Sequence, residues 1–150
     1  MSLEQQIMAQ LKEAMKSKDE AALRGLRAIK SEIIKAKTEP GAASELDAAT
    51  EMKILQKMMK QRKDSFDIFT QQGRSDLADR EKEEMIILEK FLPKQLSEAE
   101  IRDAVQQIII ETGAQSASDM GKVMGVASKS LAGKADGKTI SQVVKALLSQ

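Results

Sequence analysis

The sequence predicts an all-α, multihelical protein, and three features of its 150 residues support this prediction. Residues that favour helices, chiefly Ala, Leu, Lys, Glu, Gln and Met, dominate the composition. Aromatic residues make up 2% of the chain, and a β-sandwich or barrel is therefore disfavoured. Hydrophobic residues make up 41% and charged residues 31%, a balance typical of amphipathic helices rather than of a disordered chain.

The first two helices are predicted from apolar residues that recur at helical spacing. The first helix has an apolar residue at every fourth position from Leu3 to Met15. The second follows an N-cap at Asp19 and carries one apolar stripe as far as Ile34. The segment 38–44 contains Pro and Gly and is predicted to be a loop.

Two further helices complete the first part of the chain. Asp47 is the predicted cap of a long third helix that reaches towards Gln72. At about 25 residues, this helix would be ~37 Å long and would form the spine of the N-terminal half. Ser75 or Asp76 is the predicted cap of a fourth helix, which Pro93 ends because proline cannot continue a helix.

Three shorter helices are predicted after this proline. Ser97 and Glu100 form a capping-box pattern at the start of the fifth helix. Ser116 or Ser118 is predicted to start the sixth helix, and Asp136 to cap the seventh. The segment 91–96 separates the long helices from the short ones. We therefore expect an N-terminal four-helix subdomain over 1–93 and a small three-helix subdomain over 94–150.

The absence of two residue types limits the chemistry that we expect. The chain has no His and no Cys, so the usual zinc site, a His general base and a thiol nucleophile are all excluded. No glycine-rich phosphate loop follows a predicted strand. The sequence therefore predicts a protein that acts by binding, with no catalytic residue, no metal and no cofactor.

Composition also bears on location. No apolar run approaches the ~18 residues that would span a bilayer, and the N-terminus lacks the apolar region of a signal peptide. The absence of Cys makes secretion less favoured, so we expect a cytoplasmic protein without membrane contact. The net charge of +1 gives no global field that would indicate a nucleic-acid binder.

A lysine-rich segment in the third predicted helix is the first candidate site. Lys53, Lys57 and Lys60 share one side of the helix, and Lys63 follows within one turn. This pattern fits a strip that contacts a phosphate backbone. It equally fits a solvated helix face whose lysines pair with Glu51 or with acids of the neighbouring helix.

The second candidate is the segment 120–125, where Gly121 and Gly125 lie four residues apart in a predicted helix. Each glycine costs about 1 kcal/mol relative to Ala, so a close approach by another backbone should compensate. That backbone could belong to a neighbouring helix of the bundle or to an RNA. Lys122 lies beside the two glycines and keeps the RNA interpretation open.

The third candidate is the loop 132–138, which leads into a helix N-terminus. Free backbone N–H groups and the helix dipole favour an anion there, and Lys134 and Lys138 flank the position. The alternative is an ordinary turn in which Asp136 caps the helix. By contrast, we interpret the acidic run Glu81, Glu83, Glu84 and Glu89 as a solvated face.

Five segments, taken in order, resemble the YqeY family: 58–65, 73–78, 91–97, 120–125 and 134–138. The resemblance extends over essentially the whole chain. The family is similar to the C-terminal tail of GatB, a subunit of the amidotransferase that converts glutamate on misacylated tRNA to glutamine. In that enzyme the chemistry belongs to other domains, and the tail is associated with holding tRNA.

The resemblance implies two helical subdomains and a tRNA-binding role without catalysis. The nucleic-acid contacts that we predict are Gly121, Lys122, Gly125, Lys134, Lys138, Lys57, Lys60 and Lys63. Since the three phenylalanines lie on predicted core stripes, recognition would be of shape and backbone rather than by base stacking. The alternative is an adaptor that docks onto an amidotransferase or another translation protein. The oligomeric state is left open.

Overall fold

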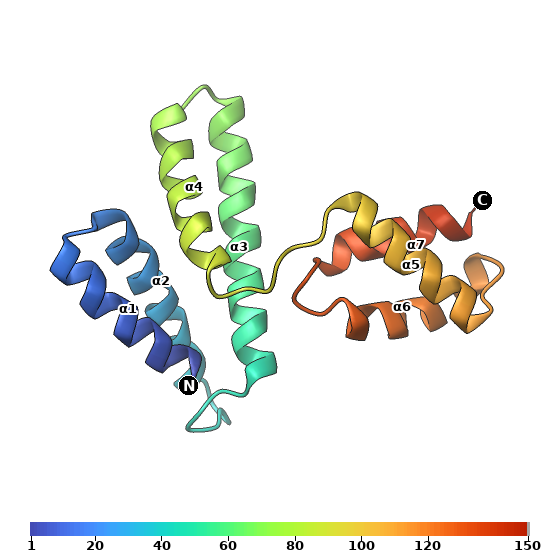
Figure 1. Cartoon of the computed structure of the whole chain (residues 1–150), viewed down its shortest axis with the longest axis horizontal. Coiled ribbons are helices and arrows are strands. Elements are labelled where there is room, and N and C mark those ends of the chain that lie inside the picture. The colour runs from blue at the N-terminus through green and yellow to red at the C-terminus, as the bar shows by residue number, and fades with distance from the viewer. Residues whose placement is uncertain (150) are drawn as a thin grey trace. The chain divides into compact units, whose positions relative to one another are not determined.

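The computed structural model describes residues 1–149 and confirms the all-α prediction. Within these residues the chain forms seven α-helices and one 3₁₀ turn, and no strand (Figure 1). The elements in order are α1 (Leu3–Ser17), α2 (Glu20–Lys37), α3 (Ala48–Gln71), α4 (Ser75–Glu89), α5 (Glu98–Thr112), η1 (Ala117–Asp119), α6 (Met120–Ser130) and α7 (Gly137–Leu148).

The helices fall into two compact units, Met1–Leu92 and Pro93–Gln150. Each unit has its own hydrophobic core, and no buried residue of one core cluster belongs to the other. Helices α1 to α4 build the N-terminal unit, and α5 to α7 with η1 build the C-terminal unit.

The N-terminal unit consists of two helical hairpins, α1–α2 and α3–α4, with α2 packed against both α3 and α4 (Figure 1). Its core is aliphatic, and Ile7, Leu26, Ile29 and Leu88 are its most deeply buried side chains. This burial follows the apolar spacing of the sequence, because residues three or four positions apart lie on the same face of a helix.

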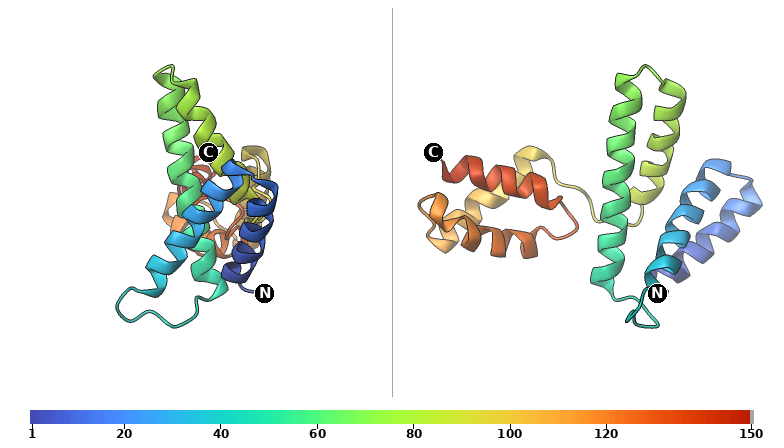
Figure 2. Two further views of the ribbon diagram at one scale, coloured as in Figure 1. Left: turned by 90° about the vertical axis from the view of Figure 1, so that its left-hand side faces the viewer. Right: turned by 180° about the vertical axis from the view of Figure 1, so that it is seen from behind.

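The half of the α3–α4 hairpin nearest its turn extends beyond this core (Figures 1 and 2). The only buried residues of α3 are Leu55 and Met58, and none of its residues from 60 to 71 is buried. In the opposing half of α4, Ala78 is the buried residue. This part of the hairpin is therefore held by the contact of two helices alone, and it leaves one long face of α3 exposed.

The C-terminal unit consists of α5, α6 and α7 packed together (Figure 2). Its small aliphatic core has Val105, Val123 and Val144 fully buried. The predicted caps of α5 and α7 are confirmed. Ser97 accepts a hydrogen bond from the Glu100 N–H at 3.2 Å, and Asp136 accepts one from the Thr139 N–H at 2.7 Å.

Both predicted boundaries of α4 are wrong. Neither Ser75 nor Asp76 caps α4. Arg74 holds the N-cap position, and its guanidinium binds Asp76 at 3.0 and 3.1 Å instead. Helix α4 ends at Glu89, several residues before Pro93, and α6 begins at Met120 after a 3₁₀ turn that Ser116 precedes.

Candidate nucleic-acid interface

Gly121 and Gly125 are both exposed on α6, and neither supports the packing of a neighbouring helix. A Cβ atom added at either position would have no other atom within 4 Å, leaving aside the local backbone. The interpretation that these glycines allow a helix of the same bundle to approach is therefore wrong. The two glycines form an open, side-chain-free strip on the surface of the unit.

Lysines flank this strip on one side. Lys122 and Lys129 are exposed on α6, and neither forms an ion pair with any residue from 1 to 149. At 100° per residue, both lie within about 100° of the glycines around the helix. Lys129 was not among the predicted contacts, although its spacing of four residues from Gly125 could have identified it.

The nearest acid to Lys122 on this helix is Asp119, which is engaged elsewhere. Its carboxylate accepts hydrogen bonds from the backbone N–H groups of Gln115 at 2.9 Å and Ser116 at 3.3 Å. These bonds lower the pKa of Asp119 below its usual value of 3.8, and the positive charge of Lys122 adds to the effect. Lys122 forms no ion pair with this carboxylate, and its exposed side chain can also meet an external anion.

The loop before α7 favours the turn interpretation over an anion site. The Asp136 carboxylate binds both the N–H and the hydroxyl of Thr139, at 2.7 and 3.1 Å, and so occupies the helix N-terminus. The backbone of Lys134 is also engaged, because its carbonyl accepts a hydrogen bond from the Leu96 N–H at 2.9 Å. The side chains of Lys134 and Lys138 remain exposed.

The predicted contacts of the C-terminal unit do not form one cluster. Lys122 lies at the beginning of α6, and the loop carrying Lys134 follows its end. The eight residues from Lys122 to Ser130 place the two regions about 12 Å apart along the helix axis. The structure therefore brings together Gly121, Lys122 and Gly125, and it places Lys134 and Lys138 at the other end of the helix.

The lysines of α3 are exposed, as a helix face that contacts a phosphate backbone requires. Lys57, Lys60 and Lys63 form no ion pair with any residue from 1 to 149. Glu51, the acid that could have paired with them, accepts a hydrogen bond from the Leu3 N–H at 2.7 Å. These three residues belong to the N-terminal unit, separately from the α6 strip.

The acidic run of α4 is a solvated face only in part, because Glu89 is exposed without an ion pair within residues 1–149 whereas the other three acids contact arginines. Glu81 and Glu84 are only 14% and 12% exposed at their side chains, and both contact Arg62 of α3, at 3.2 and 3.1 Å. Arg24 of α2 binds Glu83 at 2.6 Å and lies 3.6 Å from Glu84. The run therefore joins three helices through two arginines, which spacing within one helix could not indicate.

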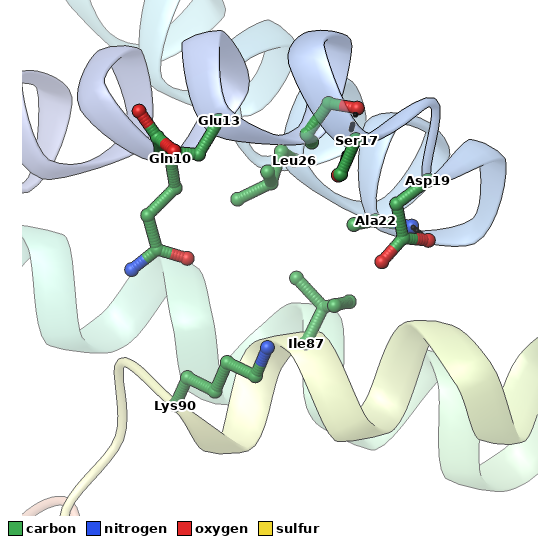
Figure 3. A pocket seen from close by; sticks show the side chains of 9 residues that line it. Gln10, Glu13, Ser17, Asp19, Ala22, Leu26, Ile87 and Lys90 are labelled. Carbon is green, nitrogen blue, oxygen red and sulfur yellow. Dashed lines mark hydrogen bonds between the residues drawn. The ribbon is translucent and has the colours of Figure 1, made fainter.

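A shallow cleft of about 250 Å³ lies in the N-terminal unit (Figure 3). Gln10 of α1 and Lys90, just after α4, extend into the opening from opposite walls. The Asp19 carboxylate caps α2 by accepting the Ala22 N–H at 3.0 Å, and Glu13 pairs with Lys16 at 3.5 Å. Both carboxylates that line the cleft therefore have partners of their own.

No group of three or more His, Cys, Asp or Glu residues within 1–149 could hold a metal ion. No helix in this range is long and apolar enough to cross a membrane.

Comparisons with known proteins show which family this chain is similar to. The model of the family described as Yqey-like protein matches residues 4–148. Three fungal relatives are each named "Altered inheritance of mitochondria protein 41, mitochondrial". The relative from Pyrenophora tritici-repentis is 32% identical over 145 residues, which cover 93% of this chain and 77% of that protein.

The other two relatives are matched over shorter stretches. The Clavispora lusitaniae protein is 34% identical over 110 residues, which cover 72% of this chain and 63% of the relative. The Lachancea thermotolerans protein is 35% identical over 103 residues, which cover 67% of this chain and 54% of the relative. The chain thus spans between about half and three quarters of the relatives' own lengths.

These names contradict the cytoplasmic location predicted from composition, because all three relatives are named as mitochondrial proteins. The physical reason for the error is that an absence of Cys argues against an oxidising compartment but does not distinguish among the remaining ones. The resemblance to the YqeY family is confirmed by the family match over 4–148. The chain belongs to the YqeY-like family.

Proposed function

We propose that the chain is a non-catalytic module that binds the sugar-phosphate backbone of structured RNA, specifically tRNA, through α6 of its C-terminal unit. The observation that carries this proposal is the open strip at Gly121 and Gly125 beside Lys122 and Lys129, none of which has a partner within residues 1–149. A backbone can approach closest where side chains are absent.

The energetic argument concerns Gly125, which lies in the middle of α6. A glycine there costs about 0.5–1 kcal/mol relative to Ala, and no contact within the unit requires it. A partner that contacts the helix backbone would offset this cost. RNA suits the position because phosphates would meet the two flanking ammonium groups, and shape recognition needs no aromatic platform.

The proposal also rests on what the chain lacks for catalysis. It contains no His and no Cys, and the cleft of the N-terminal unit presents no nucleophile with an adjacent base. Lys134, Lys138 and the α3 lysines Lys57, Lys60 and Lys63 would add phosphate contacts outside the α6 strip. Their contribution would be electrostatic and independent of RNA sequence.

The test is a fluorescence-anisotropy titration of labelled tRNA against the whole chain at several salt concentrations. Because the relatives are named as mitochondrial proteins, mitochondrial tRNA is included beside bacterial tRNA. Three or four phosphate contacts predict a log–log salt slope of about −3. An absence of binding at about 20 mM salt would remove the proposal.

Matched variants separate the α6 strip from general charge. Gly125→Gln fills the open strip, and Ala146→Gln adds the same side chain at an exposed position of α7. Lys122→Gln removes one charge beside the strip, and Lys12→Gln removes one exposed charge of α1 that has no ion pair. We expect the α6 variants to weaken binding about tenfold and the control variants less than twofold. Equal effects would exclude α6 as the contact surface.

The adaptor alternative is favoured by one observation in the C-terminal unit. Ile110 is 68% exposed at the end of α5, and Val126 of α6 is 38% exposed. Apolar contacts persist at high salt, whereas phosphate contacts do not. An association with a purified amidotransferase that survives nuclease and about 0.5 M salt, and that Ile110→Gln abolishes, would favour the adaptor over RNA binding.

A further inference from the structure

The exposed face of α3 carries three lysines, Lys53, Lys57 and Lys60, followed by two aspartates. Lys57 and Lys60 lie three residues apart, and Asp64 and Asp67 also lie three residues apart. At 100° per residue, all four fall within an arc of about 80° around the helix axis. All four side chains are exposed.

These charges have no partners within the described chain. None of the four forms an ion pair with any residue from 1 to 149. Lys60 and Asp64 are four residues apart, but the order with the base nearer the N-terminus is the less favourable one for such a pair. The order is also opposite to the one that the helix dipole favours, which places acids near the N-terminus and bases near the C-terminus.

We propose that this face of α3 binds the same face of a second copy of the chain in an antiparallel arrangement. Reversing one helix puts Lys60 of each copy opposite Asp64 of the other, and Lys57 opposite Asp67, in a single register. A two-fold axis through the level of residue 62 generates both sets of pairs twice, which is the self-complementarity that an isologous dimer requires.

The packing of the N-terminal unit supports a second copy of the chain as the partner of this α3 face. No residue of α3 from 60 to 71 is buried, and the half of the hairpin nearest its turn has little core of its own. Ile68 is 52% exposed and lies close to the charged face around the helix. In the antiparallel register it would lie beside the aliphatic stem of Lys57 of the second copy.

The same geometry sets the strength of the association. One helix face per copy buries less area than the roughly 1,200 Å² of a stable interface, so the dimer is a transient one. Its attraction comes mainly from exposed charges, which salt screens over about 10 Å at 0.1 M. Self-association is therefore expected at low salt and high protein concentration, and it is lost at high salt.

Analytical ultracentrifugation of nucleic-acid-free protein tests this proposal. The monomer is 16.5 kDa, and its weight-average mass should rise with concentration at about 20 mM salt and return to the monomer value at about 0.5 M. Lys57→Glu/Lys60→Glu makes all four facing positions acidic, and Asp64→Lys/Asp67→Lys makes all four basic. Each variant alone should be monomeric, because like charges then face each other.

An equimolar mixture of the two variants is the decisive sample. It should form a heterodimer that is at least about tenfold tighter than the wild-type dimer. Each charge then meets opposite charges at the neighbouring positions of the partner face as well as at the position directly opposite, whereas in the wild-type dimer some of these neighbours carry the same charge. Lys12→Glu/Lys145→Glu makes the same change in net charge at exposed positions of α1 and α7, and it should leave self-association unchanged. A monomeric mixture, or a variant that self-associates like the wild type, would overturn the proposal.

Zero-length carbodiimide cross-linking of the wild-type chain fixes the register. Lys57 and Asp67 are ten residues apart on one helix, about 15 Å, so an amide between them can form only between two copies. Mass spectrometry of mixed ¹⁴N- and ¹⁵N-labelled protein should find this link with both isotopes in one cross-linked peptide. Its absence at concentrations where the protein is dimeric would also overturn the proposal. Asp64→Lys/Asp67→Lys also separates self-association from RNA binding by the same lysines. The added positive charge would strengthen RNA binding, whereas self-association would be abolished.

Discussion

Gly25 of α2 lies directly against Ile87 of α4. A Cβ atom at position 25 would lie 3.1 Å from both Cβ and Cγ1 of Ile87 and 3.3 Å from its Cγ2. Both residues are buried, and Ile87 is 7% exposed. The absence of a side chain at Gly25 therefore sets how closely α2 and α4, and with them the two hairpins of the N-terminal unit, approach each other.

Gly25→Ala should destabilise the N-terminal unit. The added methyl group meets the Cβ of Ile87, which is fixed to the backbone of α4 and cannot rotate away. Overpacking of this kind costs about 1–3 kcal/mol, and the better helix propensity of Ala returns about 1 kcal/mol. We expect a net loss of about 1 kcal/mol, and at most about 2 kcal/mol, in a urea titration followed by far-UV circular dichroism. A variant as stable as the wild type would show that α2 and α4 can separate without cost.

Gly125→Ala should have the opposite effect on the C-terminal unit. A Cβ at this position of α6 meets no atom within 4 Å, so only the helix propensity changes. We expect a gain of about 0.5–1 kcal/mol in the free energy of unfolding, measured in the same way. A loss of stability would mean that the position is less open than the structure indicates.

The two glycines show what the sequence could and could not predict. The helices follow from apolar spacing and from caps such as Asp19, Asp47 and Asp136, which are local signals. Whether a helical glycine faces a neighbour or open space depends on tertiary packing. Gly25 lies within an apolar stripe, and its contact with α4 was not predicted from the sequence. For Gly125 the sequence leaves both a neighbouring helix and an RNA open as the partner, and the structure removes the neighbouring helix.

For the charged residues too, the sequence predicts positions on one helix but not contacts between helices. Lys57 and Lys60 were recognised as a strip because their spacing places them on one face of one helix. The pairing of Glu84 with Arg24 and Arg62 involves three helices, so periodicity within α4 predicted a solvated face where the structure has a partly buried network. Contacts between elements are the part of the site that a single sequence leaves open.

Glu84→Gln should destabilise the N-terminal unit by about 1–2 kcal/mol. The carboxylate of Glu84 is 12% exposed and lies 3.1 Å from Arg62 and 3.6 Å from Arg24, so removing its charge weakens the charge balance of two partly buried guanidinium groups. The estimate is moderate because Arg62 keeps Glu81 and Arg24 keeps Glu83. Chemical denaturation measures the loss.

A control and a double-mutant cycle make this prediction specific. Glu89→Gln changes an exposed residue of the same helix that has no ion pair within residues 1–149, and its effect should stay within about 0.5 kcal/mol. The cycle of Glu84→Gln with Arg62→Met should give a coupling energy of about 0.5 kcal/mol or more. Zero coupling would contradict a direct interaction between the two residues.

The C-terminal unit should lose stability in acid through Asp119. Hydrogen bonds from the N–H groups of Gln115 and Ser116 hold the pKa of its carboxyl below 3.8, its ordinary value in the unfolded chain. The folded state thus favours the ionised form, so the stabilisation is fully present above about pH 4 and is lost as the pH falls through the lower, folded pKa. Protonation weakens the acceptor that joins η1 to the preceding loop.

Asp119→Asn isolates this contribution, because an amide oxygen can accept the same N–H bonds but does not titrate in this range. The melting temperature of the wild type should exceed that of the variant near pH 7, and the difference should shrink steadily between about pH 4 and pH 2. Asp103→Asn is the control, because it changes an exposed carboxylate of α5 that accepts no hydrogen bond within residues 1–149. The difference in melting temperature between this variant and the wild type should not shrink between pH 4 and pH 2. If the Asp119→Asn and wild-type curves instead run parallel from pH 7 to pH 2, the backbone bonds at Asp119 do not favour its ionised form.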